Sequence, residues 1–167
     1  MNGIGFDAMA IGNHEFDDGP EELAKFIDAL KFPMISGNTL AGLNSPVADK
    51  FKPYIVKEFG EEKVAIVSVL ATDTDETSSP GDAVLFADEI GYLKEAVKEI
   101  EGQGIDKIVL LSHVGYIKDQ EIAAAVDGIA AGLGGQVRYR VATSGGDLEL
   151  KGPADAIRIN AATVDTE

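Results

Sequence analysis

The sequence has 167 residues and 45% apolar side chains, which is enough for one domain with a buried core and excludes wholesale disorder. Its formal net charge of −15 is spread over both halves of the chain, which argues against nucleic acid or an anionic membrane as a partner. The sequence has no cysteine and no run of about 18 apolar residues, which excludes disulfides and thiolate metal sites and predicts no membrane span.

The first motif in the chain is an apolar strand that runs into a polar turn. Residues 8–11 are apolar, Gly12 ends the run, and Asn13 and His14 follow at once. In α/β sheets, ligands bind at the edge where such strands end. Asn offers a neutral carbonyl oxygen, and His offers a ring that binds metals or carries a proton. The alternative is an ordinary turn in which Asn13 bonds locally, His14 is solvated and Asp18 caps the next helix.

The next segments predict a parallel unit and then a hairpin. Residues 20–31 have the apolar periodicity of a helix, and residues 33–38 read as a short strand, which completes a right-handed strand–helix–strand unit. Residues 54–59 and 63–70 predict a hairpin whose second arm is a buried strand. The acidic stretch 71–84 lacks the glycine and the terminal glutamate of a calcium loop, so we expect a solvated loop there.

A second strand–helix–strand unit ends at the other histidine. Residues 88–102 predict a helix, residues 106–112 a buried strand with His113 at its edge, and residues 118–127 a third helix. His14 and His113 are the two histidines of the sequence, and each lies just beyond a buried strand. A single histidine in such a place is often structural, but two at one sheet edge indicate a site.

The composition changes after the third helix. Residues 128–135 are small, and we expect them to be flexible. Residues 137–143, 147–150 and 156–160 alternate apolar and polar side chains, which predicts short antiparallel strands with one solvated face.

Several of these motifs resemble blocks of the calcineurin-like metallophosphoesterases, and more narrowly the bacterial 5′-nucleotidase branch. Residues 6–17 look like the Gly-Asn-His-Glu block of that family, and residues 111–116 look like its next histidine block. The segments between them that support the likeness are 31–38, 52–56 and 78–82. The likeness covers roughly residues 1–128, in the right order.

The resemblance implies an α/β/β/α sandwich around a centre of two divalent metal ions, which we expect to be zinc, manganese or calcium. It implies that Asn13 gives its side-chain oxygen to one metal ion and that His113 binds the same ion through a ring nitrogen. It further implies that His14 contacts the phosphate or helps to protonate the leaving oxygen. The implied reaction is hydrolysis of a nucleotide or other phosphate ester by metal-activated water.

Part of the family's pattern is absent from the sequence. The Asp-x-His and Gly-Asp blocks that precede this segment in the family are missing, and residues 130–136 contain no histidine where a Gly-His-x-His block is expected. Asn13 and His113 alone cannot hold two divalent cations. We therefore expect a fragment, a truncated gene or a recombined sequence with impaired or no turnover. The alternative is a non-catalytic metal-binding or interaction module that retains the fold.

These considerations set the expected organisation. The fold class is α/β, an incomplete sandwich of the metallophosphoesterase type with a C-terminal antiparallel β tail. Residues 1–128 form the partial metallophosphoesterase domain, and residues 129–167 form a β-rich tail packed on it. Because a central strand of the family sheet is missing, we expect the tail or a homodimer formed by strand exchange to cover the open edge. The resemblance implies a periplasmic or secreted protein, although the first residues lack the features of a signal peptide.

Overall fold

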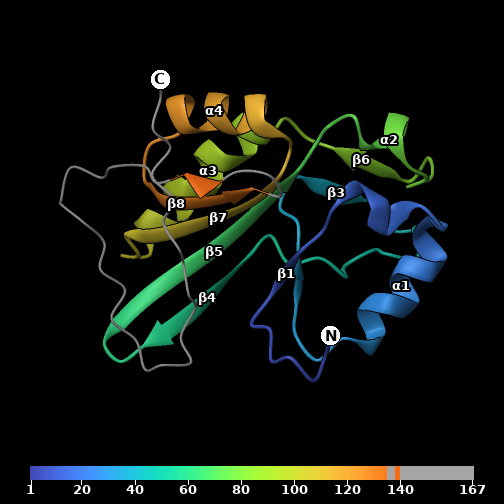
Figure 1. The fold of residues 1–167 in the computed structure, drawn as a ribbon, viewed down its shortest axis with the longest axis horizontal. Helices are drawn as coiled ribbons and strands as arrows, with labels where there is room; N and C mark the ends of the chain where they lie inside the picture. Colours follow the sequence, from blue (N-terminus) through green and yellow to red (C-terminus); the bar gives the residue numbers. More distant parts are fainter. Residues whose placement is uncertain (135–137, 140–167) are drawn as a thin grey trace.

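The structure is a computed structural model that describes residues 1–134 and 138–139. These residues form a mixed α/β fold with three sheets, one of five strands and two of two strands. Figure 1 shows the long strands of the five-stranded sheet beside the smaller sheets. No helix within the described ranges is long and apolar enough to cross a membrane.

The five-stranded sheet carries most of the core. Its strand order is β4-β5-β7-β8-β9. The bounds of these strands are β4 Tyr54–Phe59, β5 Glu62–Leu70, β7 Lys107–His113, β8 Ile129–Gly134 and β9 Arg138–Tyr139. Strands β5, β7 and β8 are parallel, whereas β4 and β9 run antiparallel to their neighbours at the two edges. The predicted hairpin is therefore confirmed as β4 and β5, and the apolar sequence of β5 is typical of a strand buried on both faces.

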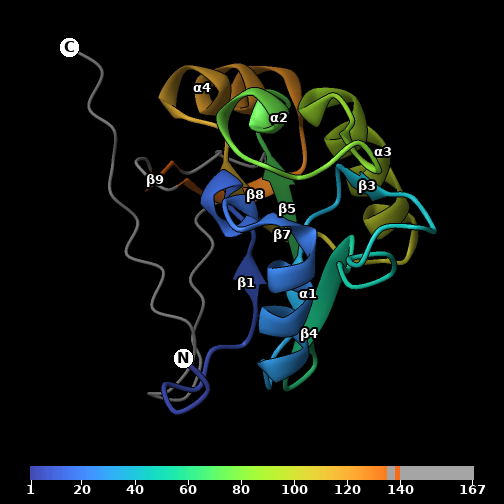
Figure 2. The same cartoon turned by 90° about the vertical axis from the view of Figure 1, so that its right-hand side faces the viewer.

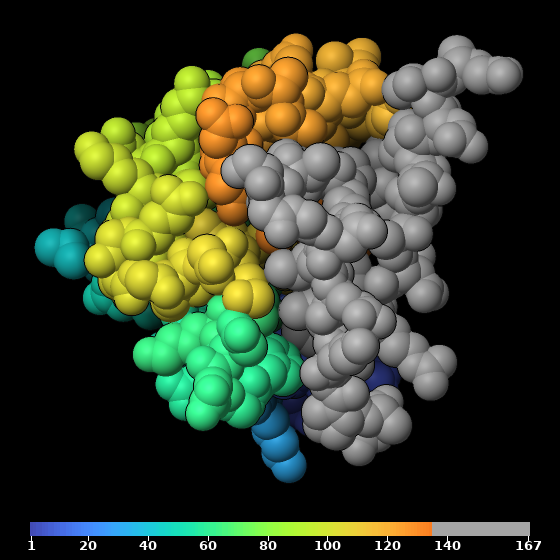
Figure 3. Space-filling view, turned by 90° about the vertical axis from the view of Figure 1, so that its left-hand side faces the viewer, coloured from blue at the N-terminus to red at the C-terminus, as the bar shows by residue number. Residues whose placement is uncertain are grey.

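Helices α3 (Glu89–Gly102) and α4 (Tyr116–Ala125) lie on the same side of this sheet (Figures 1 and 2). The space-filling view shows the residues of α3 and α4, in yellow-green and orange, above the turn between β4 and β5, in green (Figure 3). In α3, Leu93 and Ile100 are fully buried against the sheet, and the Asp88 side chain caps the helix by accepting a hydrogen bond from a backbone N–H. Both predicted helices are confirmed, and α4 begins two residues earlier than expected.

The first strand–helix–strand unit is also confirmed. Strands β1 (Met9–Ala10) and β2 (Met34–Ile35) pair in parallel, with α1 (Gly19–Ala29) between them in the chain. In both cartoon views α1 lies apart from α3 and α4 (Figures 1 and 2). A second core forms here around Phe16 and Leu70, both fully buried. Because Leu70 is the last residue of β5, this core joins the small parallel sheet to the end of the large one.

The region predicted as a solvated loop, residues 71–84, contains regular structure. Its centre is a short helix, α2 (Thr74–Thr77), and its last residue begins β6 (Val84–Phe86), which pairs antiparallel with β3 (Thr39–Ala41). The acidic side chains of α2 are exposed as expected, but Thr74 is fully buried and bonds to a backbone carbonyl. That prediction was wrong because four helical residues are too few to give a periodic signal.

The expectation of a flexible segment was also wrong over residues 128–134, and residue 135 lies outside the described residues. Residues 129–134 form β8, which pairs in parallel with β7, and its first four residues are buried. The cause is the backbone pairing with β7, which is available to small residues as well as to branched ones. Strand β9 pairs antiparallel with β8, as expected for residues 137–143. The other predicted tail strands lie outside the described residues, and the division between residues 1–128 and 129–167 stays a prediction.

Candidate active site

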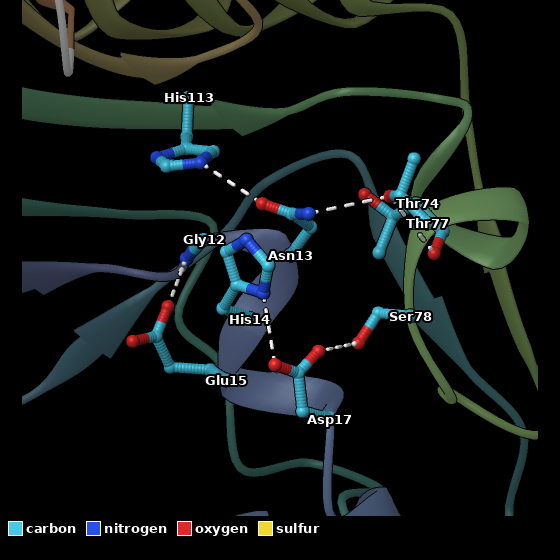
Figure 4. A network of polar contacts seen from close by, with 9 residues as sticks. All are labelled: Gly12, Asn13, His14, Glu15, Asp17, Thr74, Thr77, Ser78 and His113. Carbon is cyan, nitrogen blue, oxygen red and sulfur yellow. Dashed lines mark hydrogen bonds and ion pairs between the residues drawn. The ribbon is translucent and has the colours of Figure 1, made fainter.

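The structure brings together two of the predicted site residues that are far apart in the sequence. Asn13 begins a short 3₁₀ helix, Asn13–Phe16, that follows β1, and His113 is the last residue of β7. The Nε2 atom of His113 lies 3.1 Å from Oδ1 of Asn13 (Figure 4). The carboxamide and the imidazole therefore meet, but at the ends of strands from two different sheets and not at the edge of one sheet as expected.

Backbone contacts hold this pair in place. The Ala71 N–H donates to the carbonyl of His113 over 3.1 Å, which fixes the end of β7 to the end of β5. The Gly12 N–H donates to Oε2 of Glu15 over 2.6 Å, which closes the turn that presents Asn13. Gly12 has extended backbone angles, but a Cβ atom there would lie 3.0 Å from Cε1 of His113. The absence of a side chain at Gly12 is what lets the His113 ring approach the turn.

His14 belongs to a separate chain of contacts on the same turn. Its Nδ1 atom lies 2.8 Å from Oδ2 of Asp17, and the Ser78 hydroxyl donates to Oδ1 of Asp17 over 2.7 Å (Figure 4). The hydrogen bonds from Ser78 and from His14 lower the pKa of Asp17 below its usual value. At neutral pH Asp17 is therefore an ionised acceptor, so the proton of its bond to His14 must be on Nδ1.

The accessibility of His14 suits contact with a ligand. The side chains of His14 and Asp17 are 76% and 51% exposed, so the ring can reach a bound molecule. The same exposure means that the ion pair formed when the ring is protonated stabilises the fold little. The contact is better explained as a means of orienting the ring than as a source of stability.

The Asn13 and His113 atoms fit part of a metal site. Two donors bonded to one cation at about 2.1 Å lie roughly 3.0–3.4 Å apart, which matches the 3.1 Å between Oδ1 of Asn13 and Nε2 of His113. Oxygen and imidazole are also donors that zinc and manganese accept. In the described part of the chain, however, no group of three or more His, Asp or Glu side chains is placed to hold a metal ion. The donor types fit a divalent cation, and the two donors are fewer than one requires.

Two buried acids support the strand ends behind His113. The Ser112 hydroxyl donates to Oδ1 of Asp119 over 2.6 Å, and burial raises the pKa of Asp119. Glu89, which is 2% exposed, accepts a hydrogen bond from the backbone N–H of Thr72. Both acids lie in the first turn of a helix, where the helix dipole favours negative charge. We assign them a structural role.

Sequence reasoning missed three residues of this site. Asp17 lies in the block of residues 6–17 and was given no role there, although its spacing of three residues from His14 on a helical turn places the two side chains on one face. Thr77 and Ser78 carried no signal of their own, because their partners Asn13 and Asp17 are more than 60 residues away in the chain. Such contacts become visible once α2 is placed against the turn.

No protein-family model matches the chain. It is 38% identical over 140 residues to a probable 5′-nucleotidase of Treponema pallidum, a match that covers 83% of this chain and 24% of that protein. The solved structure of a 5′-nucleotidase precursor from Thermus thermophilus matches at 40% identity with a TM-score of 0.74, over 78% of this chain and 26% of the other. A calcineurin-like phosphoesterase from Bacillus subtilis shares the fold at 24% identity and a TM-score of 0.67, over 80% of this chain and 46% of the other.

These matches confirm the predicted resemblance. The chain spans about a quarter of the length of the curated relatives it matches. Over about four fifths of its own length, and as a partial match, the chain is similar to the 5′-nucleotidases, and it shares its fold with a calcineurin-like phosphoesterase.

Proposed function

We propose that this chain is part of a metal-dependent phosphoric ester hydrolase of the 5′-nucleotidase type. The single observation that carries the proposal is the 3.1 Å contact between Oδ1 of Asn13 and Nε2 of His113, which without metal is a hydrogen bond and is also the spacing of two ligands on one cation. The proposed substrate is a nucleotide or other phosphate ester, and the names of the relatives refer to nucleotides. We also propose that the fold of this chain is part of the α/β/β/α sandwich of the family.

Asn13 and His113 are the proposed metal ligands, and zinc, manganese or calcium the proposed ions. When bound, such a cation activates water and offsets the negative charge on the phosphoryl oxygens. The carboxamide oxygen is neutral and cannot be protonated at ordinary pH. The imidazole ligates in its neutral form.

His14 is the proposed catalytic residue. With Nδ1 bonded to the Asp17 carboxylate, its Nε2 atom is left for the substrate. In the protonated ring both nitrogens donate, so Nε2 can give a hydrogen bond to a phosphate oxygen or a proton to the leaving oxygen. The nearby negative charge of Asp17 offsets the positive charge of that ring. Asp17 thus sets the orientation of His14.

We further propose that turnover by this chain alone is impaired or absent, since the described residues supply two donors to a centre that needs more. The second candidate, a non-catalytic metal-binding or interaction module that retains the fold, is favoured by the same observation. A homodimer formed by strand exchange and a periplasmic or secreted location both stay predictions.

The test measures phosphate release from AMP and from p-nitrophenyl phosphate with manganese, zinc or calcium, together with manganese binding followed by electron paramagnetic resonance. The variants are Asn13→Ala and His113→Ala, with Asn44→Ala as the control, because Asn44 is exposed. We expect each site variant to weaken metal binding about tenfold or more, since each removes one of two donors. If the unmodified chain binds metal but releases no phosphate, and the two site variants lose metal binding, the result selects the non-catalytic module. Metal binding and hydrolysis that are insensitive to both variants would refute the site.

A further inference from the structure

The C-terminal end of α2 lies against the turn that carries Asn13 and His14. Figure 4 shows Thr77 beside Asn13, and Ser78 beside Asp17. We propose that Thr77 and Ser78 are a pair of positioning residues, which fix the carboxamide of Asn13 and, through Asp17, the ring of His14. The role of these two orientations in metal binding and catalysis rests on the proposed function, but the orientations themselves can be measured without it.

The hydroxyl of Thr77 determines which way the Asn13 amide faces. Its Oγ1 atom lies 3.3 Å from the Asp73 carbonyl and 3.5 Å from the Thr74 carbonyl, and a carbonyl only accepts. The hydroxyl proton therefore points back into α2. The remaining lone pairs of Oγ1 can only accept, so the group facing them must be the Nδ2 end of Asn13, at 3.3 Å. With Nδ2 directed to Thr77, the Oδ1 atom is directed to His113.

The reversed amide would be unfavourable on the Thr77 side. It would place Oδ1 of Asn13 against a hydroxyl oxygen whose proton is already donated elsewhere, so two acceptors would face each other. Without the Thr77 hydroxyl, the amide would have no such preference on this side. The orientation of the amide would then depend on the His113 ring nitrogen alone, which donates or accepts according to its tautomer. Thr77 acts on the site through Asn13 and does not contact the substrate position itself.

Ser78 acts on His14 in a similar way, through Asp17. The Ser78 hydroxyl donates to one carboxylate oxygen over 2.7 Å, and Nδ1 of His14 lies 2.8 Å from the other. Because the carboxylate is held at one oxygen, the second oxygen stays in the plane where it meets the ring. An ionised carboxylate has no proton to give, so the neutral ring is held in the tautomer that carries its proton on Nδ1. A free imidazole side chain has no such constraint. In the neutral His14 ring the lone pair is therefore on Nε2, which is the atom that carries the second proton when the ring is charged.

The two contacts belong together because Thr77 and Ser78 are adjacent. Thr77 is the last residue of α2, and Ser78 follows it in an extended conformation, which directs the two hydroxyls to different partners. Thr74, fully buried, bonds through its hydroxyl to the Ala71 carbonyl and so anchors the start of α2. Ala71 in turn bonds to the end of β7. The pair is therefore supported by the same strand ends that carry His113.

The test uses the chain without metal and compares matched substitutions. Ser78→Ala and Thr77→Val remove each hydroxyl, Ser78→Thr and Thr77→Ser retain it, and Ser79→Ala is the control, because Ser79 is exposed and adjacent. Nitrogen chemical shifts of the His14 ring at about pH 8.5, where imidazole is ordinarily neutral, give the ratio of the two tautomers. Solvent exchange of the Asn13 side-chain amide protons reports their hydrogen bond.

We expect the Nδ1–H tautomer to dominate in the unmodified chain and its ratio to the other tautomer to fall several-fold in Ser78→Ala. We expect amide exchange of Asn13 to be several-fold faster in Thr77→Val. The conservative variants and Ser79→Ala should match the unmodified chain. Unchanged tautomer ratio and exchange in the two hydroxyl-deleted variants would overturn the proposal, and a change in only one would overturn the pairing. Neither readout needs metal or hydrolysis, so metal binding that is insensitive to Asn13→Ala and His113→Ala would refute the proposed function without affecting this result.

Discussion

Asn38 is the buried polar residue on which the joint between the sheets most depends. Its side chain is fully buried, and Nδ2 donates to the Leu70 carbonyl over 2.7 Å and to the Ala87 carbonyl over 2.9 Å. Its Oδ1 atom accepts from the Leu70 N–H over 2.8 Å. One side chain thus binds the backbone at the end of β5 and at the entry to α3. We predict that Asn38→Ala is among the most destabilising single changes in the described part of the chain.

The magnitude follows from the groups that this change would leave unpaired. One backbone N–H and two carbonyls would lose their Asn38 partners, and each stranded buried group costs about 1–3 kcal/mol. Carbonyls tolerate the loss better than an N–H because each has a second lone pair. We therefore expect the free energy of unfolding to fall by about 3–5 kcal/mol, a large part of the roughly 5–15 kcal/mol that stabilises an ordinary domain.

Urea unfolding followed by circular dichroism, with linear extrapolation to water, measures this loss. The matched control is Asn44→Ala, because Asn44 is exposed, and its effect should stay within about 0.5 kcal/mol. A loss below about 1 kcal/mol for Asn38→Ala would refute the reasoning. It would mean that water enters the vacated space and satisfies all three backbone groups.

Three further changes test other parts of the structure. Burial raises the pKa of Asp119 above its ordinary 3.8, so the native state holds the carboxyl proton more tightly than the unfolded state does. The free energy of unfolding should therefore fall as the pH rises from 3.8 through the raised pKa. Asp119→Asn should remove that slope from melting temperatures measured against pH, and an unchanged slope would contradict the assignment. A Cβ atom at Gly37 would lie 1.9 Å from the Tyr92 ring, so Gly37→Ala should lower the free energy of unfolding in urea by about 1–3 kcal/mol. Adding Tyr92→Leu to the same chain should recover part of this loss. Gly12→Ala should change the free energy of unfolding by less than about 1 kcal/mol. It should nevertheless shift the ring resonances of His113, because a Cβ atom at Gly12 would lie 3.0 Å from that ring. Unchanged resonances would count against the close approach.

The long elements of the fold could be predicted from the sequence because their signals are local. The helix α3 has an apolar face at helical spacing, and β5 and β7 are apolar runs of the length of buried strands. The meeting of Asn13 and His113 was expected from parallel strands that end at one sheet edge. The structure brings the two residues together, but from two different sheets, since β1 pairs with β2 in a two-stranded sheet and β7 belongs to the five-stranded sheet. That prediction needed no knowledge of the side-chain contacts.

The remaining features depend on tertiary contacts that leave no local pattern. The strand β8 is rich in alanine and glycine, and its identity as a strand comes from pairing with β7. The helix α2 is four residues long and is held by the buried Thr74. Its effect on Asn13 and Asp17 passes through single hydroxyl groups, which no periodicity records.

The same strand ends determine both the stability of the fold and the geometry of the site. Asn38 holds the backbone of Leu70, and the next residue, Ala71, donates its N–H to the carbonyl of His113. A change that frees Leu70 therefore also loosens the strand end on which the His113 ring depends. The Gly12 turn that presents Asn13, by contrast, is closed by its own local bond to Glu15. It follows that weakening the fold at Asn38 should displace His113 relative to Asn13 before it disturbs the turn, so the 3.1 Å contact between them is the first part of the site to be lost.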